Sequence, residues 1–165
     1  MAGNQKKRLA LDTNLLLDLA KGLDFAHDFL GVFQSAKYSM LAGPTVFREL
    51  GFAAIYGQEP EKSWATMAIA AASQCSILAF DLTHLDQTIA ERFAQKLLEI
   101  GLLPPEEHND ALILAETAVE NIPLLVTSDK HLLDMDEDAL ALAFSTADLP
   151  AAHPVHPKAL LKAMR

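Results

Sequence analysis

The sequence contains a single cysteine, Cys75, among its 165 residues. One cysteine cannot form an internal disulfide, and it cannot supply the cysteine cluster of a structural zinc site. His153 and His156 have no cysteine and no further histidine at ligand spacing, so we interpret them as surface residues. The scarcity of cysteine fits a reducing compartment, and we therefore expect a cytoplasmic location.

Long hydrophobic runs are also absent, because charged residues interrupt every apolar stretch before it reaches the about 20 residues that a membrane-spanning helix needs. The basic stretch Lys6-Lys7-Arg8 precedes apolar residues, as in a signal peptide. However, Asp12, Asn14 and Asp18 interrupt the apolar segment that would follow it. We therefore expect a protein without a membrane association.

Basic residues are few, since 13 Lys and Arg stand against 22 Asp and Glu, which gives a formal net charge of −9 at pH 7. This balance is opposite to that of most nucleic-acid-binding proteins and argues against a protein that coats DNA non-specifically. It is compatible with an enzyme that holds divalent cations among carboxylates, because the ions reverse the local charge where a phosphate docks.

The hydrophobic content of 51% is sufficient for a globular core, and the chain contains no internal repeat, low-complexity tract or linker. We therefore expect one domain over residues 1–165. Short apolar runs alternate with helical patterns, which is typical of an α/β fold with parallel strands. The predicted strands are residues 9–11, 37–42, 76–80 and 122–127, with a last edge strand near Val155.

The stretch from Arg8 to Asp18 organises this pattern, because a short apolar run ends at Asp12 before a second one begins. The first run suits a strand that is buried on both faces, and the second suits a helix. Asp12 would then lie at the carboxyl end of a parallel strand, which is the edge where open α/β sheets bind ligands. The alternative interpretation is that Asp12 or Thr13 only caps the helix.

Three other acidic residues occupy comparable positions. Asp129 follows a predicted strand, Asp110 begins a predicted helix, and Glu49 lies beside the apolar stripe of another helix. Taken singly, the aspartates are explained as helix caps, and the glutamate as a solvated side chain or a partner of Arg48. In a right-handed βαβ arrangement, however, all of them can converge with Asp12 at one sheet edge. Divalent cations with oxygen ligands would relieve their mutual repulsion.

Four short motifs follow one another along the chain. They are Leu11-Asp12-Thr13-Asn14, Thr45-Val46-Phe47-Arg48-Glu49-Leu50, Asn109-Asp110-Ala111-Leu112-Ile113-Leu114-Ala115 and Val126-Thr127-Ser128-Asp129-Lys130-His131-Leu132-Leu133. In this order they resemble the motifs of the PIN-domain ribonucleases, and the resemblance spans Leu9 to about Leu133. The resemblance implies a three-layer α/β/α sandwich with a central, mainly parallel sheet. It also implies a catalytic and metal-binding set, Asp12, Glu49, Asp110 and Asp129, with Asn14 and Thr127 as supporting polar residues. Glu107 is expected to lie outside this set.

The leading hypothesis is a metal-dependent endoribonuclease that uses Mg²⁺ or Mn²⁺ to activate water and to hydrolyse RNA phosphodiester bonds. The resemblance extends to VapC-like toxin nucleases, which implies an antitoxin protein as a partner. The resemblance also implies that the chain forms dimers. Together with apolar stripes on several helices, it predicts a homodimer. Two alternatives are a non-catalytic PIN-like scaffold that binds a partner and an aspartyl phosphatase. The latter usually carries a second acid two residues after its nucleophile, where this chain has Asn14.

Overall fold

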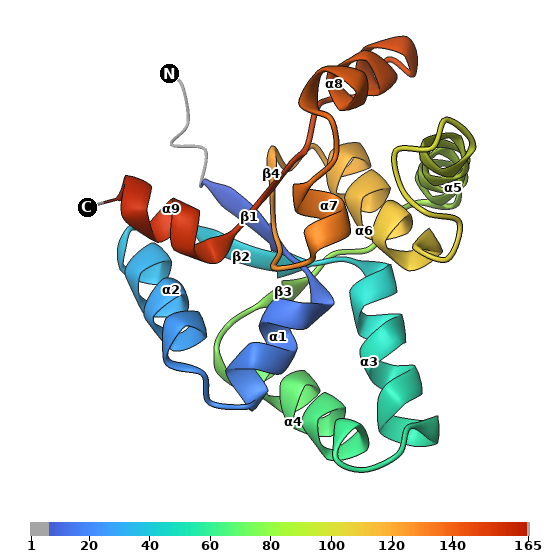
Figure 1. The fold of residues 1–165 in the computed structure, drawn as a ribbon. Coiled ribbons are helices and arrows are strands. Elements are labelled where there is room, and N and C mark those ends of the chain that lie inside the picture. Colours follow the sequence, from blue (N-terminus) through green and yellow to red (C-terminus); the bar gives the residue numbers. More distant parts are fainter. Residues whose placement is uncertain (1–6, 165) are drawn as a thin grey trace.

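The computed structural model describes residues 7–164, so Lys6 of the basic stretch considered above lies outside the described residues. Within them, a five-stranded sheet has the strand order β3-β2-β1-β4-β5, and each neighbouring pair is parallel (Figure 1). The strands are β1 (Arg8–Leu11), β2 (Ser39–Ala42), β3 (Leu78–Ala79), β4 (Leu124–Val126) and β5 (His153–Val155). The sheet confirms the prediction of a mainly parallel α/β fold.

The strand order runs from β1 to β3 in one direction and through β4 to β5 in the other. Because crossover connections between parallel strands are right-handed, the two directions place their helices on opposite faces of the sheet. Helices α2 and α9 pack together on one side, and α5 and α6 pack together on the opposite side (Figure 1). The helices are α1 (Thr13–Ala20), α2 (Asp24–Ser35), α3 (Pro44–Tyr56), α4 (Glu61–Gln74), α5 (His84–Glu99), α6 (His108–Val119), α7 (Lys130–Leu133), α8 (Glu137–Thr146) and α9 (Pro157–Ala163). The result is the predicted three-layer sandwich.

Local sequence signals account for several helix ends. The Thr83 hydroxyl accepts the N–H of Asp86 at 3.1 Å and caps α5. Gly22 and Gly101 follow the ends of α1 and α5 with φ angles of +75° and +77°, a region that glycine enters without a steric penalty. The predicted strand 76–80 is shorter in the structure, since β3 lies at the sheet edge and Ser76 forms a turn with φ of +57°.

The strand order reverses beside β1, which pairs with β2 on one side and with β4 on the other. The strand residues Leu9, Ala10 and Leu11 are buried in the core, as expected for a central parallel strand. At such a reversal the connections leave in opposite directions and open a crevice beyond the carboxyl ends of the strands. Asp12 follows β1 at this crevice. No helix of the described chain combines the length and apolarity needed to cross a bilayer.

Candidate metal-binding active site

Asp12 is held between the two strands that flank the reversal. Its backbone N–H donates to the carbonyl of Val126 in β4 at 3.0 Å. Its side chain is 1% exposed, with Oδ1 accepting the N–H of Thr13 at 2.7 Å and Oδ2 accepting the hydroxyl of Thr127 at 2.6 Å. Asp12 is therefore the N-cap residue of α1 and also a carboxylate at the crevice. The capping role and the position at the ligand-binding edge, which the sequence left as alternatives, are both present.

Asp129 also combines a cap with a place at the crevice. Its Oδ1 accepts the N–H groups of His131 at 2.8 Å and Leu132 at 3.2 Å, which caps the short helix α7. Its own N–H donates to Thr127 Oγ1 at 3.0 Å. Since Thr127 also donates to Asp12, this one hydroxyl links the two strand-end carboxylates.

Three carboxylates form what we call the acidic cluster: Glu107, Asp110 and Asp129. Each offers one oxygen, and these oxygens all lie within 4.8 Å of one another. The expectation that Glu107 lies outside the site is therefore wrong. Glu107 is the residue at the N-cap of α6, and Asp110 follows three residues later, so both side chains lie on the same face of the first turn. The spacing of three residues between Glu107 and Asp110 is the feature of the sequence that could have identified Glu107.

Burial and mutual repulsion raise the pKa of the acids here. Burial first, then a hydrogen bond with Glu107 and the charges of Asp12 and Asp129, raise the pKa of Asp110 to about 9. Burial raises the pKa of Asp12 to about 6, against the lowering effect of its hydrogen bonds from Thr127 and Thr13. Burial is the largest cause of both shifts, and the charges of the neighbouring acids add to it.

Little positive charge offsets this crowding. The ion pairs in the described part of the chain are Arg8–Glu120, remote from the site, and His131–Glu107, with Nε2 3.5 Å from Oε1. Neither a lysine nor an arginine forms an ion pair with Asp12, Asp110 or Asp129 in those residues. Clustered carboxylate oxygens without a lysine or arginine partner are the donor set that hard divalent cations such as Mg²⁺ and Mn²⁺ prefer.

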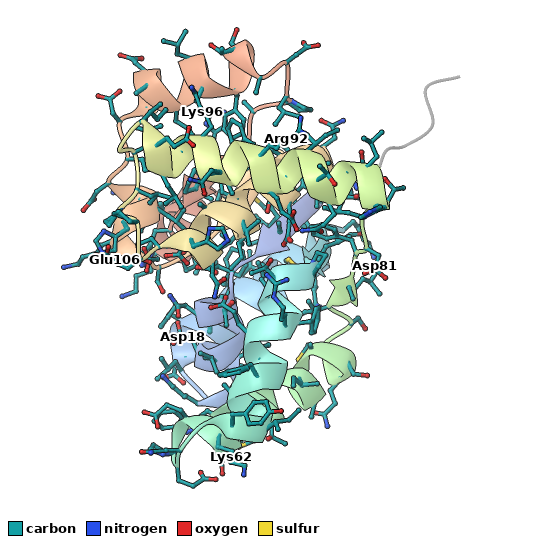
Figure 2. All side chains as sticks on the ribbon, turned by 90° about the vertical axis from the view of Figure 1, so that its right-hand side faces the viewer. Asp18, Lys62, Asp81, Arg92, Lys96 and Glu106 are labelled. Atoms are coloured by element: carbon teal, nitrogen blue, oxygen red, sulfur yellow. The ribbon has the colours of Figure 1, made fainter. Side chains whose placement is uncertain are left out.

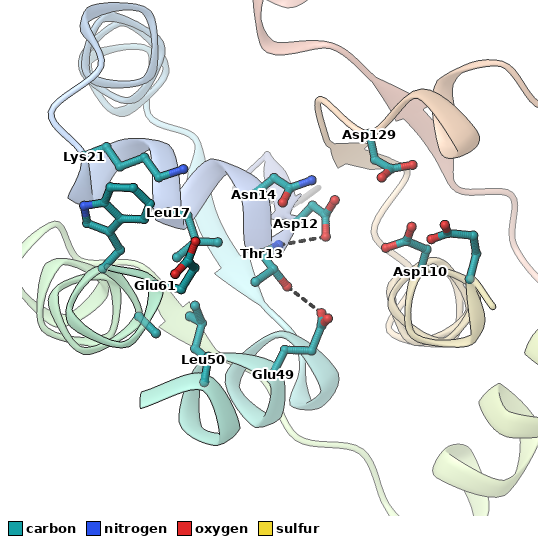
Figure 3. A pocket seen from close by; sticks show the side chains of 14 residues that line it. Asp12, Thr13, Asn14, Leu17, Lys21, Glu49, Leu50, Glu61, Asp110 and Asp129 are labelled. Carbon is teal, nitrogen blue, oxygen red and sulfur yellow. Dashed lines mark hydrogen bonds between the residues drawn. The ribbon is translucent and has the colours of Figure 1, made fainter. Parts of the chain in front are cut away.

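Glu49 reaches the same pocket from α3 but is not part of the acidic cluster (Figure 3). Its Oε1 accepts the hydroxyl of Thr13 at 2.7 Å, and its Oε2 lies 3.4 Å from the amide nitrogen of Asn109. Arg48, considered above as a partner of Glu49, donates instead to Thr45 Oγ1 at 3.2 Å. Glu49 is therefore oriented by neutral groups.

The four acids singled out in the sequence line one pocket of about 430 Å³. Asp12, Glu49, Asp110 and Asp129 all line it, as does Asn14. Asp110 and Asp129 share the acidic cluster with Glu107, and Asp12 lies close enough to raise the pKa of Asp110. Glu49 lies outside the cluster, and its charge makes a smaller contribution to the raised pKa of Asp12.

Glu116, which is 0% exposed on α6, was not singled out from the sequence. Its carboxylate accepts the N–H of Thr45 at 3.0 Å, the hydroxyl of Thr45 at 2.8 Å and the amide of Gln87 at 3.3 Å. Burial raises its pKa against these hydrogen bonds. Because Thr45 lies one helical turn before Glu49, Glu116 fixes the start of the helix that carries Glu49.

The structure is similar to solved structures of two VapBC proteins. VapBC2 from Rickettsia felis, bound to a DNA fragment from the promoter, aligns with a TM-score of 0.61 and 17% identity over 90% of this chain and 98% of that chain. VapBC-1 from nontypeable Haemophilus influenzae aligns with a TM-score of 0.58 and 14% identity over 92% and 98%. The chain has a PIN-like fold. No family model and no curated protein matches the sequence, so the likeness concerns the fold.

Proposed function

We propose that the protein is a metal-dependent endoribonuclease. The observation that carries the proposal is the acidic cluster of Glu107, Asp110 and Asp129, which lies beside Asp12 where the strand order reverses. A non-catalytic scaffold would gain nothing from crowding carboxylates that raise each other's pKa, because this arrangement destabilises the folded protein.

The residues of the acidic cluster would hold Mg²⁺ or Mn²⁺, with Asp12 as a further ligand. A bound ion lowers the pKa of water and offsets the charge that develops on an attacked phosphate. Thr127 and the N–H groups at the start of α7 keep the carboxylates of Asp12 and Asp129 in fixed orientations. Glu49, on the opposite wall, is a hydrogen-bond acceptor available to a water or an RNA hydroxyl.

We also propose that the chain is the toxin of a toxin–antitoxin pair. The support is the similarity in fold to the two VapBC proteins and the resemblance of the motifs to VapC-like toxins. Expression of the chain alone should then arrest bacterial growth, and co-expression of an antitoxin from the adjacent gene should restore it. Growth arrest that persists in the Asp110→Asn variant would contradict an RNA-cleaving toxin.

Thermal denaturation with and without divalent metal tests the proposed metal site. An ion that binds only the folded protein at 100 times its dissociation constant adds about 2.7 kcal/mol to the free energy of unfolding. We expect Mg²⁺ or Mn²⁺ to raise the melting temperature of the wild type and to support cleavage of single-stranded RNA. Asp110→Asn should lose both effects, while its metal-free melting temperature at neutral pH stays near that of the wild type, because a pKa of about 9 already keeps Asp110 protonated there.

Glu106→Gln is the matched control, since Glu106 is exposed beside Glu107 and points to the periphery of the molecule (Figure 2). This variant should keep both the metal-induced rise and the cleavage of RNA. A wild-type melting temperature that is indifferent to millimolar metal, together with intact RNA, would favour the scaffold alternative. Metal binding without cleavage would contradict the nuclease but retain the metal site.

A further inference from the structure

The pocket extends from the acidic cluster to a second end, which is lined mostly by apolar side chains and by a lysine. Lys21, Trp64, Leu17, Leu50 and Ala53 line this end, which we call the Lys21–Trp64 end. Figure 3 shows Lys21 at one side of the pocket and Asp110 and Asp129 at the other, with Leu17 and Leu50 along the wall near Lys21. The pocket is therefore acidic at one end, and its other end combines apolar side chains with Lys21 and Glu61.

Lys21 is the only cation among the described residues that line the pocket. It is exposed, and its Nζ lies 4.5 Å from the centroid of the Trp64 ring. An ammonium over an indole is held by the electrostatic attraction of the ring face. This contact keeps the cation at the pocket instead of leaving it free in solvent. Glu61, also exposed, lies at the same end but forms no ion pair with Lys21 in the described part of the chain.

We propose that the Lys21–Trp64 end binds a nucleotide of single-stranded RNA that flanks the phosphate at the acidic cluster. The inference rests on the proposed function, which places one phosphate of the RNA at that cluster. A neighbouring phosphate would meet the Lys21 ammonium. The adjoining sugar and base would contact the apolar wall of Leu17, Leu50 and Ala53. An apolar wall next to one fixed cation suits a nucleotide, which joins an apolar base to an anionic phosphate.

The protein contains one tryptophan, so its tryptophan fluorescence reports on this end of the pocket alone. An octamer of oligouridylate is titrated in the presence of Ca²⁺, which takes the same kind of oxygen ligands as Mg²⁺. Gel electrophoresis of the titrated RNA verifies that it remains intact. Anisotropy of the same RNA carrying a dye reports binding anywhere on the protein. We expect saturable quenching of Trp64 emission with the same midpoint as the anisotropy change.

The variant Lys21→Met keeps the apolar stem of the side chain and removes the charge. We expect it to raise the dissociation constant about two- to fivefold, as for the loss of one exposed charge pair. The plot of log affinity against log salt should also become less steep by about 0.7, the slope for one phosphate contact on a single strand. A purely structural role for Lys21 at the end of α1 would leave that slope unchanged, and the melting temperature of the variant measures such a role separately.

Lys62→Met is the matched control, because Lys62 is exposed on the same helix as Trp64 but does not line the pocket (Figure 2). It should keep the wild-type slope. In cleavage assays, Lys21→Met should raise KM with little change in kcat. Equal salt slopes for the two variants, or RNA binding that leaves Trp64 emission unchanged, would overturn the proposal. Either result leaves the metal-induced stabilisation and the cleavage of RNA, which test the proposed function, unaffected.

Discussion

At the scale of single residues, the site is built from carboxylates that would be more stable in water. Asp12 and Asp110 both have raised pKa values, chiefly because of burial. Each therefore makes the metal-free protein less stable when it ionises. The same property favours the binding of a cation, because a cation offsets the unfavourable burial of an ionised carboxylate as well as the repulsion between neighbouring carboxylates.

The first prediction concerns the pH dependence of stability without metal. The folded-state pKa values of Asp12 and Asp110, about 6 and about 9, exceed the ordinary value of 3.8. At any pH between 3.8 and its own folded-state pKa, each of the two residues therefore holds more protons in the folded protein than in the unfolded chain. The contribution of the two residues to stability falls as pH rises, up to about pH 6 for Asp12 and about pH 9 for Asp110. For buried Asp12 the loss is roughly 3 kcal/mol.

Thermal denaturation in EDTA from about pH 5 to about pH 9 measures this effect. Asp110→Asn should flatten the decrease above neutral pH and should be more stable than the wild type at the alkaline end. Glu106→Gln should follow the wild-type curve. A wild-type melting temperature that rises between neutral and alkaline pH, with Asp110→Asn parallel to it, would contradict the crowding of charge at the site.

The second prediction concerns Glu116, which joins α6 to the start of α3. Glu116→Ala removes the acceptor of two donors of Thr45 and one of Gln87, and each buried donor left without a partner is unfavourable. We expect a loss of roughly 2–4 kcal/mol in the free energy of unfolding. Glu116→Gln keeps an acceptor for the Thr45 N–H and removes a buried charge, so its loss should be about 1 kcal/mol. Urea denaturation compares the two variants, and equal losses would contradict this account.

At the scale of secondary structure, the N-cap residues of α1 and α7, Asp12 and Asp129, are also parts of the site. Asp129 caps α7 with Oδ1, and it contributes a carboxylate oxygen to the acidic cluster. The side chain of asparagine is also a good N-cap but has no charge. The two roles of Asp129 can therefore be separated by the choice of substitution.

The third prediction compares Asp129→Asn with Asp129→Ala. Both should lose most of the metal-induced rise in melting temperature. Only Asp129→Ala should also destabilise the metal-free protein, by about 1 kcal/mol, because it removes the cap. Differential scanning calorimetry with and without Mn²⁺ distinguishes the two effects. A metal response that survives in either variant would exclude Asp129 as a ligand.

Much of the fold at this scale could be predicted from the sequence, since short apolar runs and helix-end residues such as Thr83 and Gly101 act locally. The strand-end positions of Asp12 and Asp129 were predictable for the same reason. Glu107 was missed although its position three residues before Asp110 is a local signal. Glu116 was not recognised because an acidic residue in an apolar helix is defined only by its tertiary neighbours. The Gln87 amide that Glu116 accepts lies on another helix, 29 residues away in the sequence.

At the scale of the whole molecule, an apolar patch is exposed on α3. Its members Phe52, Ile55 and Tyr56 are 65%, 65% and 70% exposed, and their spacing places them on one face of the helix. The rings of Phe52 and Tyr56 lie 5.0 Å apart. Large exposed side chains gathered in this way commonly mark protein interfaces.

The fourth prediction is therefore a homodimer in solution, with this patch at its interface. Light scattering at micromolar concentration should give twice the chain mass of 17.9 kDa. Ile55→Glu should yield a monomer. Leu142→Glu, which changes a residue that is 68% exposed on α8, should remain a dimer. A monomeric wild type would contradict the prediction, and the opposite behaviour of the two variants would move the interface to α8.

The hydrogen bond between Thr127 and Asp12 joins residues 115 positions apart in the chain. During synthesis, Asp12 is made early, while Thr127 and Asp129 are added only after most of the sequence. At about 5–20 residues per second, the ribosome needs roughly 6–23 s to extend the chain from Asp12 to Asp129. Throughout this interval the nascent chain lacks one wall of the pocket. Until Asp129 has been added, the nascent chain therefore cannot assemble the acidic cluster.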